Sequence, residues 1–97
     1  MAIGDSFNQF AGTATTTRQP SSGVFEQISA DVSPGSTDIS TLYNGSVALS
    51  VWDPSVVTGA SAANNALNLA LLIGNTVYYR KTGTTDRHFI AGVQVDA

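Results

Sequence analysis

The stretch LYNGSVALSVW, residues 42–52, predicts two antiparallel strands joined by a tight turn. Asn-Gly between two apolar runs is the strongest short-range signal for a β-hairpin, so we place a type I′ turn at Asn44 and Gly45. After the turn, every second residue from Val47 to Val51 is aliphatic. This alternation is typical of a strand that buries one of its faces.

Strand signals of this kind recur along the chain, and turn signals separate them at intervals of about 8–12 residues. The expected strands are residues 24–32, 39–43, 46–52, 66–73, 76–82 and 87–95. Residues 54–65 are expected to form a long loop, and one helical turn within residues 54–73 remains an alternative because Ala and Leu favour helices. The pattern predicts an all-β fold, either a small antiparallel β-sandwich or a jelly-roll-like barrel.

Two of the expected strands have a face on which apolar residues gather. In the first strand that face is expected to be mostly buried, with Glu26 as its one exception. Its apolar members are Val24, Ile28, Ala30 and Val32. In the last strand the apolar face consists of Phe89, Ala91, Val93 and Val95.

Residues 1–22 differ in composition from the rest and are predicted to form an extended N-terminal arm, while residues 23–97 form the β-sandwich domain. The segment before Gly23 is rich in Thr, Ser, Gly and Pro, which favours weak structure. Phe7 and Phe10 are aromatic residues of a kind that disordered tails usually lack. We therefore expect the arm to dock on a neighbouring subunit, with a disordered terminus as the alternative.

The composition argues against several partners. Charged residues make up 11% of the chain, against about 25% in typical domains, and 22 serines and threonines supply neutral hydroxyl groups instead. The net charge is −3, with only four Lys and Arg residues. A nucleic-acid binder has a basic footprint, and an anionic membrane surface attracts basic segments. We expect neither nucleic acid nor a membrane as a partner.

No motif for catalysis or for a cofactor is present. There is no cysteine, and the lone His88 does not make a zinc site by itself. We expect His88 to be a partly exposed strand residue, with an interface or pH-sensing role as the alternative. Asp31 and Asp38 flank one turn and are the acidic pair considered for a shared cation. The chain has no G-x-S-x-G sequence and no phosphate-binding glycine loop. We expect no enzyme, no cofactor and no metal site.

Most of the positive charge gathers at one predicted hairpin, at Arg80, Lys81 and Arg87, beside Tyr78. Basic and aromatic residues together can bind single-stranded nucleic acid, but three charges in an acidic chain favour a carboxylate on a partner subunit. Alternation places Arg80 and Lys81 on opposite faces, and arginine holds carboxylates bidentately. The candidate partner-interface residues are Phe7, Phe10, Trp52, Tyr78 and Arg80.

Three segments resemble, in order, parts of a group of small virion proteins of tailed phages. They are QPSSGVFEQISADV (19–32), ISTLYNGS (39–46) and IGNTVYYRKTGTTDRHFIAGVQV (73–95). The shared pattern is Q-P-x-x-G before a strand, L-Y-[ND]-G-S at a hairpin, N-T-x-Y-[LY]-R before a turn, and G-V-Q in the closing strand. The resemblance implies a β-sandwich on the outside of a capsid, or a small tail component, and it supplies no binding residue.

The resemblance, the acidic charge and the lack of a catalytic set together favour a head decoration, or cement, protein of a tailed phage. Such a protein lies on the outer capsid surface of the virion and binds the major capsid protein across subunit joints. It would also bind itself, and a homotrimer would match a three-fold lattice axis. The alternative is a receptor- or carbohydrate-binding module of a tail or head fibre, with Trp52, Tyr78 or Tyr79 as stacking platforms.

Overall fold

The structure is a computed structural model that describes residues 2–10, 15–34, 38–53, 64–83 and 88–96. These residues contain eight β-strands and no helix, so the predicted all-β fold is confirmed. The strands are β1 (Ser6–Phe10), β2 (Thr16–Arg18), β3 (Phe25–Pro34), β4 (Ile39–Tyr43), β5 (Ala48–Trp52), β6 (Asn64–Ile73), β7 (Tyr78–Thr82) and β8 (Phe89–Asp96). β6 is the strand that we favoured over a helical turn. Residues 54–63 of the loop predicted at 54–65 lie outside the described ranges, as do residues 35–37 and 84–87. The loop prediction is wrong for Asn64 and Asn65, which belong to β6.

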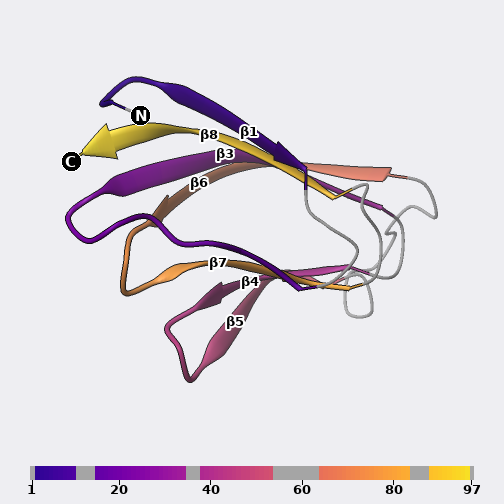
Figure 1. The fold of residues 1–97 in the computed structure, drawn as a ribbon. Coiled ribbons are helices and arrows are strands. Elements are labelled where there is room, and N and C mark those ends of the chain that lie inside the picture. The colour runs from indigo at the N-terminus through magenta and orange to yellow at the C-terminus, as the bar shows by residue number, and fades with distance from the viewer. Residues whose placement is uncertain (1, 11–14, 35–37, 54–63, 84–87, 97) are drawn as a thin grey trace.

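The strands form two antiparallel sheets of four, which lie as two layers (Figure 1). Sheet A has the order β1-β8-β3-β6, and sheet B has the order β2-β7-β4-β5. Strands pair from the two ends of the chain inward, β1 with β8, β2 with β7, β3 with β6 and β4 with β5. This is the jelly-roll topology, in which one long hairpin of four strand pairs is wrapped so that successive pairs alternate between two sheets. The predicted sandwich is confirmed, and the two sheets do not close into a barrel.

The hairpin between β4 and β5 is the tip of this roll, and its turn differs from the predicted type I′. Gly45 has a φ of 93°, but no described residue other than glycine has a positive φ, so Asn44 does not meet the type I′ requirement. Instead, Oδ1 of Asn44 accepts hydrogen bonds from the backbone N–H groups of Ser46 (3.0 Å) and Val47 (2.8 Å). The asparagine side chain thus supports the chain reversal in place of a second left-handed residue.

The N-terminal segment is extended but is not separate from the sandwich. β1 pairs with β8 along its whole length, and β2 pairs with β7, so the segment supplies an edge strand to each sheet. Phe7 is buried in the core with 7% of its surface exposed, and its predicted docking on a neighbouring subunit does not hold. Composition did not reveal β1, because so short an edge strand becomes ordered only by pairing with β8. Phe10 remains 71% exposed.

A β-bulge at Ser29 decides which side chains of β3 face the interior. β3 lies between β6 and β8, and both registers shift at this residue. Here β3 has one residue more than β8 and one fewer than β6. One extra residue reverses the alternation of faces that follows it. Asp31 and Ser33 are therefore buried in the interior, while Ala30 and Val32 lie on the outer face and are half-buried. The predicted burial of Ala30 and Val32 in the core is wrong for this reason.

In β8 the more apolar face is likewise the outer one. Ile90, Gly92 and Gln94 point inward and are buried. Their neighbours Phe89 and Val93 point outward, on the outer face of sheet A. The apolar core that remains between the sheets is small. It consists of Phe7, Ile28, Ile73, Tyr79 and Ile90, with Leu42, Leu69 and Leu71 packed against it.

Gly92 is the position of closest approach within sheet A. Phe7 is its register partner across β1 and β8, and a Cβ atom on Gly92 would lie 2.6 Å from the Phe7 ring. The same Cβ atom would collide with the backbone carbonyl oxygen of Gln27. A backbone carbonyl in a central strand has little room to move, so this position requires glycine.

We expect Gly92→Ala to lower the free energy of unfolding by about 3 kcal/mol, the upper part of the usual range for overpacking. Gly45→Ala is the control, because its Cβ atom meets nothing within 4 Å. At Gly45 only the positive φ is unfavourable for alanine, so the expected decrease in the free energy of unfolding is about 1 kcal/mol. Urea denaturation of both variants measures the difference, and equal losses would contradict the close packing at Gly92.

Candidate functional site

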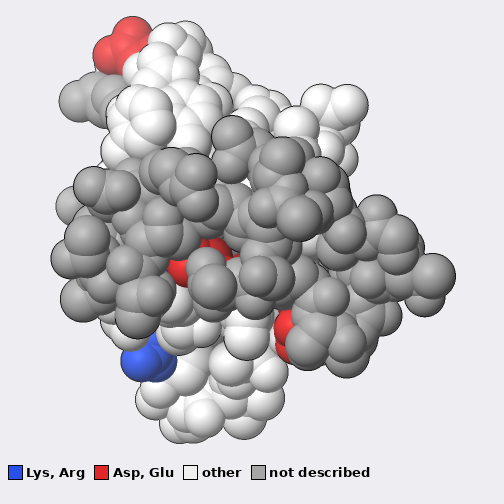
Figure 2. Space-filling view, turned by 90° about the vertical axis from the view of Figure 1, so that its right-hand side faces the viewer, with Lys and Arg blue, Asp and Glu red and all other residues white. Residues whose placement is uncertain are grey.

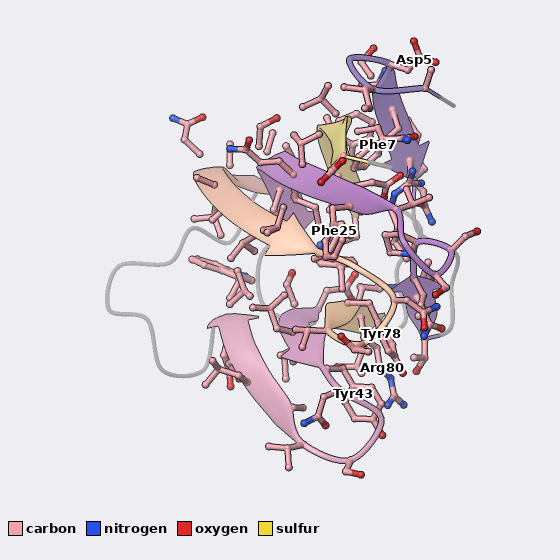
Figure 3. The ribbon with its side chains drawn as sticks, turned by 90° about the vertical axis from the view of Figure 1, so that its left-hand side faces the viewer. Asp5, Phe7, Phe25, Tyr43, Tyr78 and Arg80 are labelled. Carbon is pink, nitrogen blue, oxygen red and sulfur yellow. The ribbon has the colours of Figure 1, made fainter. Side chains whose placement is uncertain are left out.

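Three side chains form a patch on the outer face of sheet B (Figure 3). Tyr43 in β4 and Tyr78 in β7 are register partners, and their rings meet edge to face with centres 5.8 Å apart. The guanidinium carbon of Arg80 lies 4.6 Å from the centre of the Tyr43 ring. This cation–π contact holds the charged group against the surface. We call Tyr43, Tyr78 and Arg80 the sheet B patch.

The charge of Arg80 is not matched by a carboxylate within the described part of the chain. None of the ion pairs found there includes Arg80. Its backbone is fixed, because the hydroxyl group of Thr41 donates a hydrogen bond of 2.8 Å to the Arg80 carbonyl. A positioned guanidinium presents a planar fork of N–H donors that fits a carboxylate or phosphate. The sheet B patch therefore has the chemistry to hold an anionic group.

The other predicted interface residues do not join this patch. Trp52 is 7% exposed and faces the interior, and Phe7 is in the core. Phe10 lies on the outer face of sheet A, where its ring centre is 4.9 Å from that of Phe89. Of the five residues that sequence selected, only Tyr78 and Arg80 come together.

A second candidate is a cluster of polar side chains buried between the sheets. Each member is less than 2% exposed. The members are Asp31, Ser33, Asp38, Ser40, Tyr79, Lys81 and His88. The expectation that His88 is partly exposed is therefore wrong, because the bulge in β3 brings a carboxylate inward to meet its ring. We call these seven residues the interior polar cluster.

The charged members of the interior polar cluster pair with one another. Nε2 of His88 lies 2.7 Å from Oδ1 of Asp31. Oδ2 of Asp38 lies 3.4 Å from Nζ of Lys81 and 3.4 Å from Nδ1 of His88. Removing a charge from water costs several kcal/mol unless it is paired, so each buried base has a carboxylate beside it. The two aspartates, considered from the sequence for a shared cation, contact basic side chains instead.

The interior polar cluster contains serine, histidine and aspartate but does not have the geometry of a catalytic triad. In a triad the aspartate binds one ring nitrogen and the serine binds the other. Here Asp38 faces Nδ1 at 3.4 Å without a hydrogen bond, and Ser40 shares Nε2 with Asp31 and Tyr79. The gap beside His88 and Tyr79 is too narrow for a water molecule. The hydrogen bonds are those of a packed structural network.

Tyr79 links this network to the apolar core. Its hydroxyl group lies 2.7 Å from Nε2 of His88 and 3.4 Å from Oγ of Ser40. Burial raises the pKa of Tyr79 far above its usual value, and the nearby Asp31 carboxylate raises this pKa further. The side chain therefore keeps its proton wherever the protein is folded.

Arg18 in β2 connects the two sheets at an open pocket of about 450 Å³. Its Nε and Nη2 atoms each donate a hydrogen bond of 2.7 Å to Glu26, and Nη1 donates one of 2.8 Å to Gln9. The guanidinium also lies 3.6 Å from the centre of the Phe7 ring. Arg18 is not among the interface residues predicted from the sequence. Glu26 was the available signal, because a single carboxylate on an otherwise apolar strand face indicates a buried partner of opposite charge. The rest of the pocket is lined mainly by amide and hydroxyl groups.

Other site types find no support in the part of the chain that the structure describes. It holds no group of three or more His, Cys, Asp or Glu side chains placed to bind a metal ion. It also has no helix long and apolar enough to cross a membrane. In Figure 2 the described charged side chains form small separate patches. Comparison of the chain with models of protein families, with curated proteins and with solved structures gave no match.

We expect the raised pKa of Tyr79 to make the fold sensitive to alkali. In the unfolded chain tyrosine ionises near pH 10, whereas the folded protein holds the proton, so the unfolded state binds fewer protons above that pH. Stability is then lost by up to about 1.4 kcal/mol per pH unit as the pH rises. Tyr79→Phe removes this contribution.

Urea unfolding of the wild type and of Tyr79→Phe, measured between about pH 9 and pH 11.5, tests this expectation around the ordinary tyrosine pKa. Tyr79→Phe has a lower free energy of unfolding than the wild type already at about pH 9, because it lacks the hydrogen bonds of the hydroxyl group. The quantity compared is therefore the slope of the free energy of unfolding against pH. The slope of the variant should be flatter above pH 10. Parallel curves would show that Tyr79 ionises equally in both states.

Proposed function

We propose that this protein is a head decoration protein of a tailed phage, located on the outer capsid surface. The sheet B patch carries this proposal, because it presents Arg80, a positioned cation with no carboxylate beside it among the described residues. Jelly-roll sandwiches are common in viral capsid proteins, and also in lectins and cupins. The fold thus agrees with the proposal without singling it out.

The segments that resemble phage virion proteins meet beside the sheet B patch. Tyr43 belongs to the L-Y-N-G-S segment, and Tyr78 and Arg80 belong to the N-T-V-Y-Y-R segment. The Q-P segment is bonded to the latter, because Gln19 donates a hydrogen bond of 2.8 Å to the Asn75 carbonyl. Asn75 in turn donates one of 3.1 Å to the Pro20 carbonyl. Segments far apart in sequence thus support one surface.

In the proposed mechanism, Arg80 holds a carboxylate of the major capsid protein, and Tyr43 keeps the guanidinium in place. A protein that binds only the mature lattice stabilises that lattice by mass action, by about 2.7 kcal/mol at one hundred times its dissociation constant. The two tyrosine rings supply apolar contact area beside the ion pair. The function needs no reaction, which agrees with the packed geometry of the interior polar cluster.

We expect the purified protein to sediment with mature heads that lack it and not with immature heads. Arg80→Lys should weaken binding about tenfold, because lysine keeps the charge but loses the bidentate geometry. Arg80→Ala should weaken it at least about thirtyfold, as expected when a paired interfacial charge is removed. Ile3→Ala, a change at an exposed position ahead of β1 in sheet A, is the control. Equal binding by all four proteins would contradict a role for Arg80, and no binding by the wild type would contradict the proposed function.

A carbohydrate-binding module is the second candidate, and one observation favours it. Of the three rings considered as stacking platforms, Trp52 and Tyr79 are buried, and only Tyr78 reaches the surface. Tyr78 lies edge to face with Tyr43, and an aromatic ring with a hydroxyl group offers an apolar face and a polar tip to a sugar.

Tyr78→Ala separates the two functions. A sugar-binding protein should bind an array of bacterial surface glycans, and Tyr78→Ala should abolish that binding while Arg80→Lys changes it little. A decoration protein should show no glycan binding above background. Retention of glycan binding by Tyr78→Ala would exclude Tyr78 as the stacking platform.

A further inference from the structure

The outer face of sheet A is free of charge. Its four strands contain three charged residues, Glu26, Asp31 and Asp96. Glu26 and Asp31 are buried in the interior, and Asp96 is the last residue of β8. No Asp, Glu, Lys or Arg therefore points outward within the described strands of this sheet.

Apolar side chains line up across this face. The registers place Phe10, Phe89, Val32 and Ala66 side by side, one from each strand. Phe10 is 71% exposed, and Leu72 in the edge strand β6 is 59% exposed. Between them lie further small and β-branched residues and the uncharged amides Asn8, Gln27 and Asn68. Sheet A is the upper layer in Figure 1.

Sheet A differs from an ordinary one-sided sheet, because buried charged side chains lie beside the core on its inner face while apolar side chains also lie on its outer face. The bulge at Ser29 turns Asp31 inward and Val32 outward. A sheet usually packs its apolar face on the core and leaves its polar face to solvent. Monomeric proteins rarely expose an apolar patch larger than a few hundred Å². The outer face of sheet A therefore has the composition of a surface that is covered in the working protein.

We propose that a second copy of this chain covers the outer face of sheet A, sheet against sheet, about a two-fold axis. Each copy has a net charge of −3, so two copies repel each other unless they meet where charge is absent. An uncharged apolar face is self-complementary, as a two-fold interface requires, and aligned sheets stack about 10 Å apart.

The size of the face agrees with this pairing. At about 4.8 Å between strands and about 3.3 Å per residue, the four strands span roughly 500 Å² before side-chain relief is counted. A stable interface uses about 800 Å² of accessible surface per partner. The roughly 500 Å² counts the flat area of the backbone only, and projecting side chains make the accessible surface of the face larger than this flat area.

The pairing rests on the proposed function for its role, and it specifies how one decoration protein could contact two capsid subunits. Sheet B lies on the far side of the sandwich from this face (Figure 1), so a face-to-face pair would have one sheet B patch at each of its two ends. Two Arg80 side chains would then hold carboxylates on two different capsid subunits. The pair would span a joint in the shell, and a single copy would not.

Sedimentation velocity at roughly 1 to 100 μM, the range in which interfaces of this modest size associate, tests the pairing. Val93→Lys and Val93→Glu each place a charge in the middle of the face, and Ser50→Lys places the same charge on sheet B. Circular dichroism verifies that each variant is folded. We expect dimers for the wild type and Ser50→Lys, and at least tenfold weaker dimerisation for each Val93 variant. Mixing the two Val93 variants should restore dimers, because their charges are opposite.

Several results would overturn the pairing. They are a monomeric wild type, a trimer, or dimers that persist in both Val93 variants. A trimer is the state expected above from a three-fold axis of the capsid lattice. In a trimer each copy contacts its neighbours through two different surfaces, whereas the proposed dimer uses one face twice. Loss of head binding by a Val93 variant that still dimerises would assign the face to the shell. Dimers that do not bind heads would support the pairing while contradicting the proposed function.

Discussion

The β-bulge at Ser29 sets which side chains of β3 face the interior, and the buried polar network follows from it. β3 lies between β8 and β6, so one extra residue in it sets the facing of side chains for the middle of sheet A. The hydroxyl group of Ser29 donates a hydrogen bond of 3.3 Å to the Ala91 carbonyl and holds the bulge against β8. Without the extra residue, Asp31 would point to solvent, and His88 would lose the nearer of its two carboxylate neighbours.

The interior polar cluster explains how a small apolar core still specifies one arrangement of strands. Buried ion pairs contribute little net stability, because desolvation offsets much of their attraction. A shift of register, however, would leave Lys81 buried without its aspartate. Such a buried charge without a partner costs about 3–5 kcal/mol. The cluster thus penalises wrong registers more than it stabilises the correct one.

The two outer faces of the sandwich differ in chemistry, and the proposals divide between them. The face of sheet A is apolar and uncharged, which suits contact with an identical face. The face of sheet B holds Arg80 against Tyr43 and presents a cation, which suits an anionic partner. In the two proposals each face contacts another protein, and this is the requirement that a decoration protein has to meet.

Local sequence patterns located six of the eight strands and did not locate β1 and β2. Asn44-Gly45 marked the tip of the roll, β-branched and aromatic runs marked the strands, and the opposite facing of Arg80 and Lys81 followed from alternation within one strand. Only the tertiary structure decided which face of sheet A is inside, because a bulge depends on the registers of two neighbouring strands. It also decided that β1 belongs to a sheet and that Asp31 meets His88, 57 positions further along the chain. Such pairings join residues far apart in sequence, and no local pattern records them.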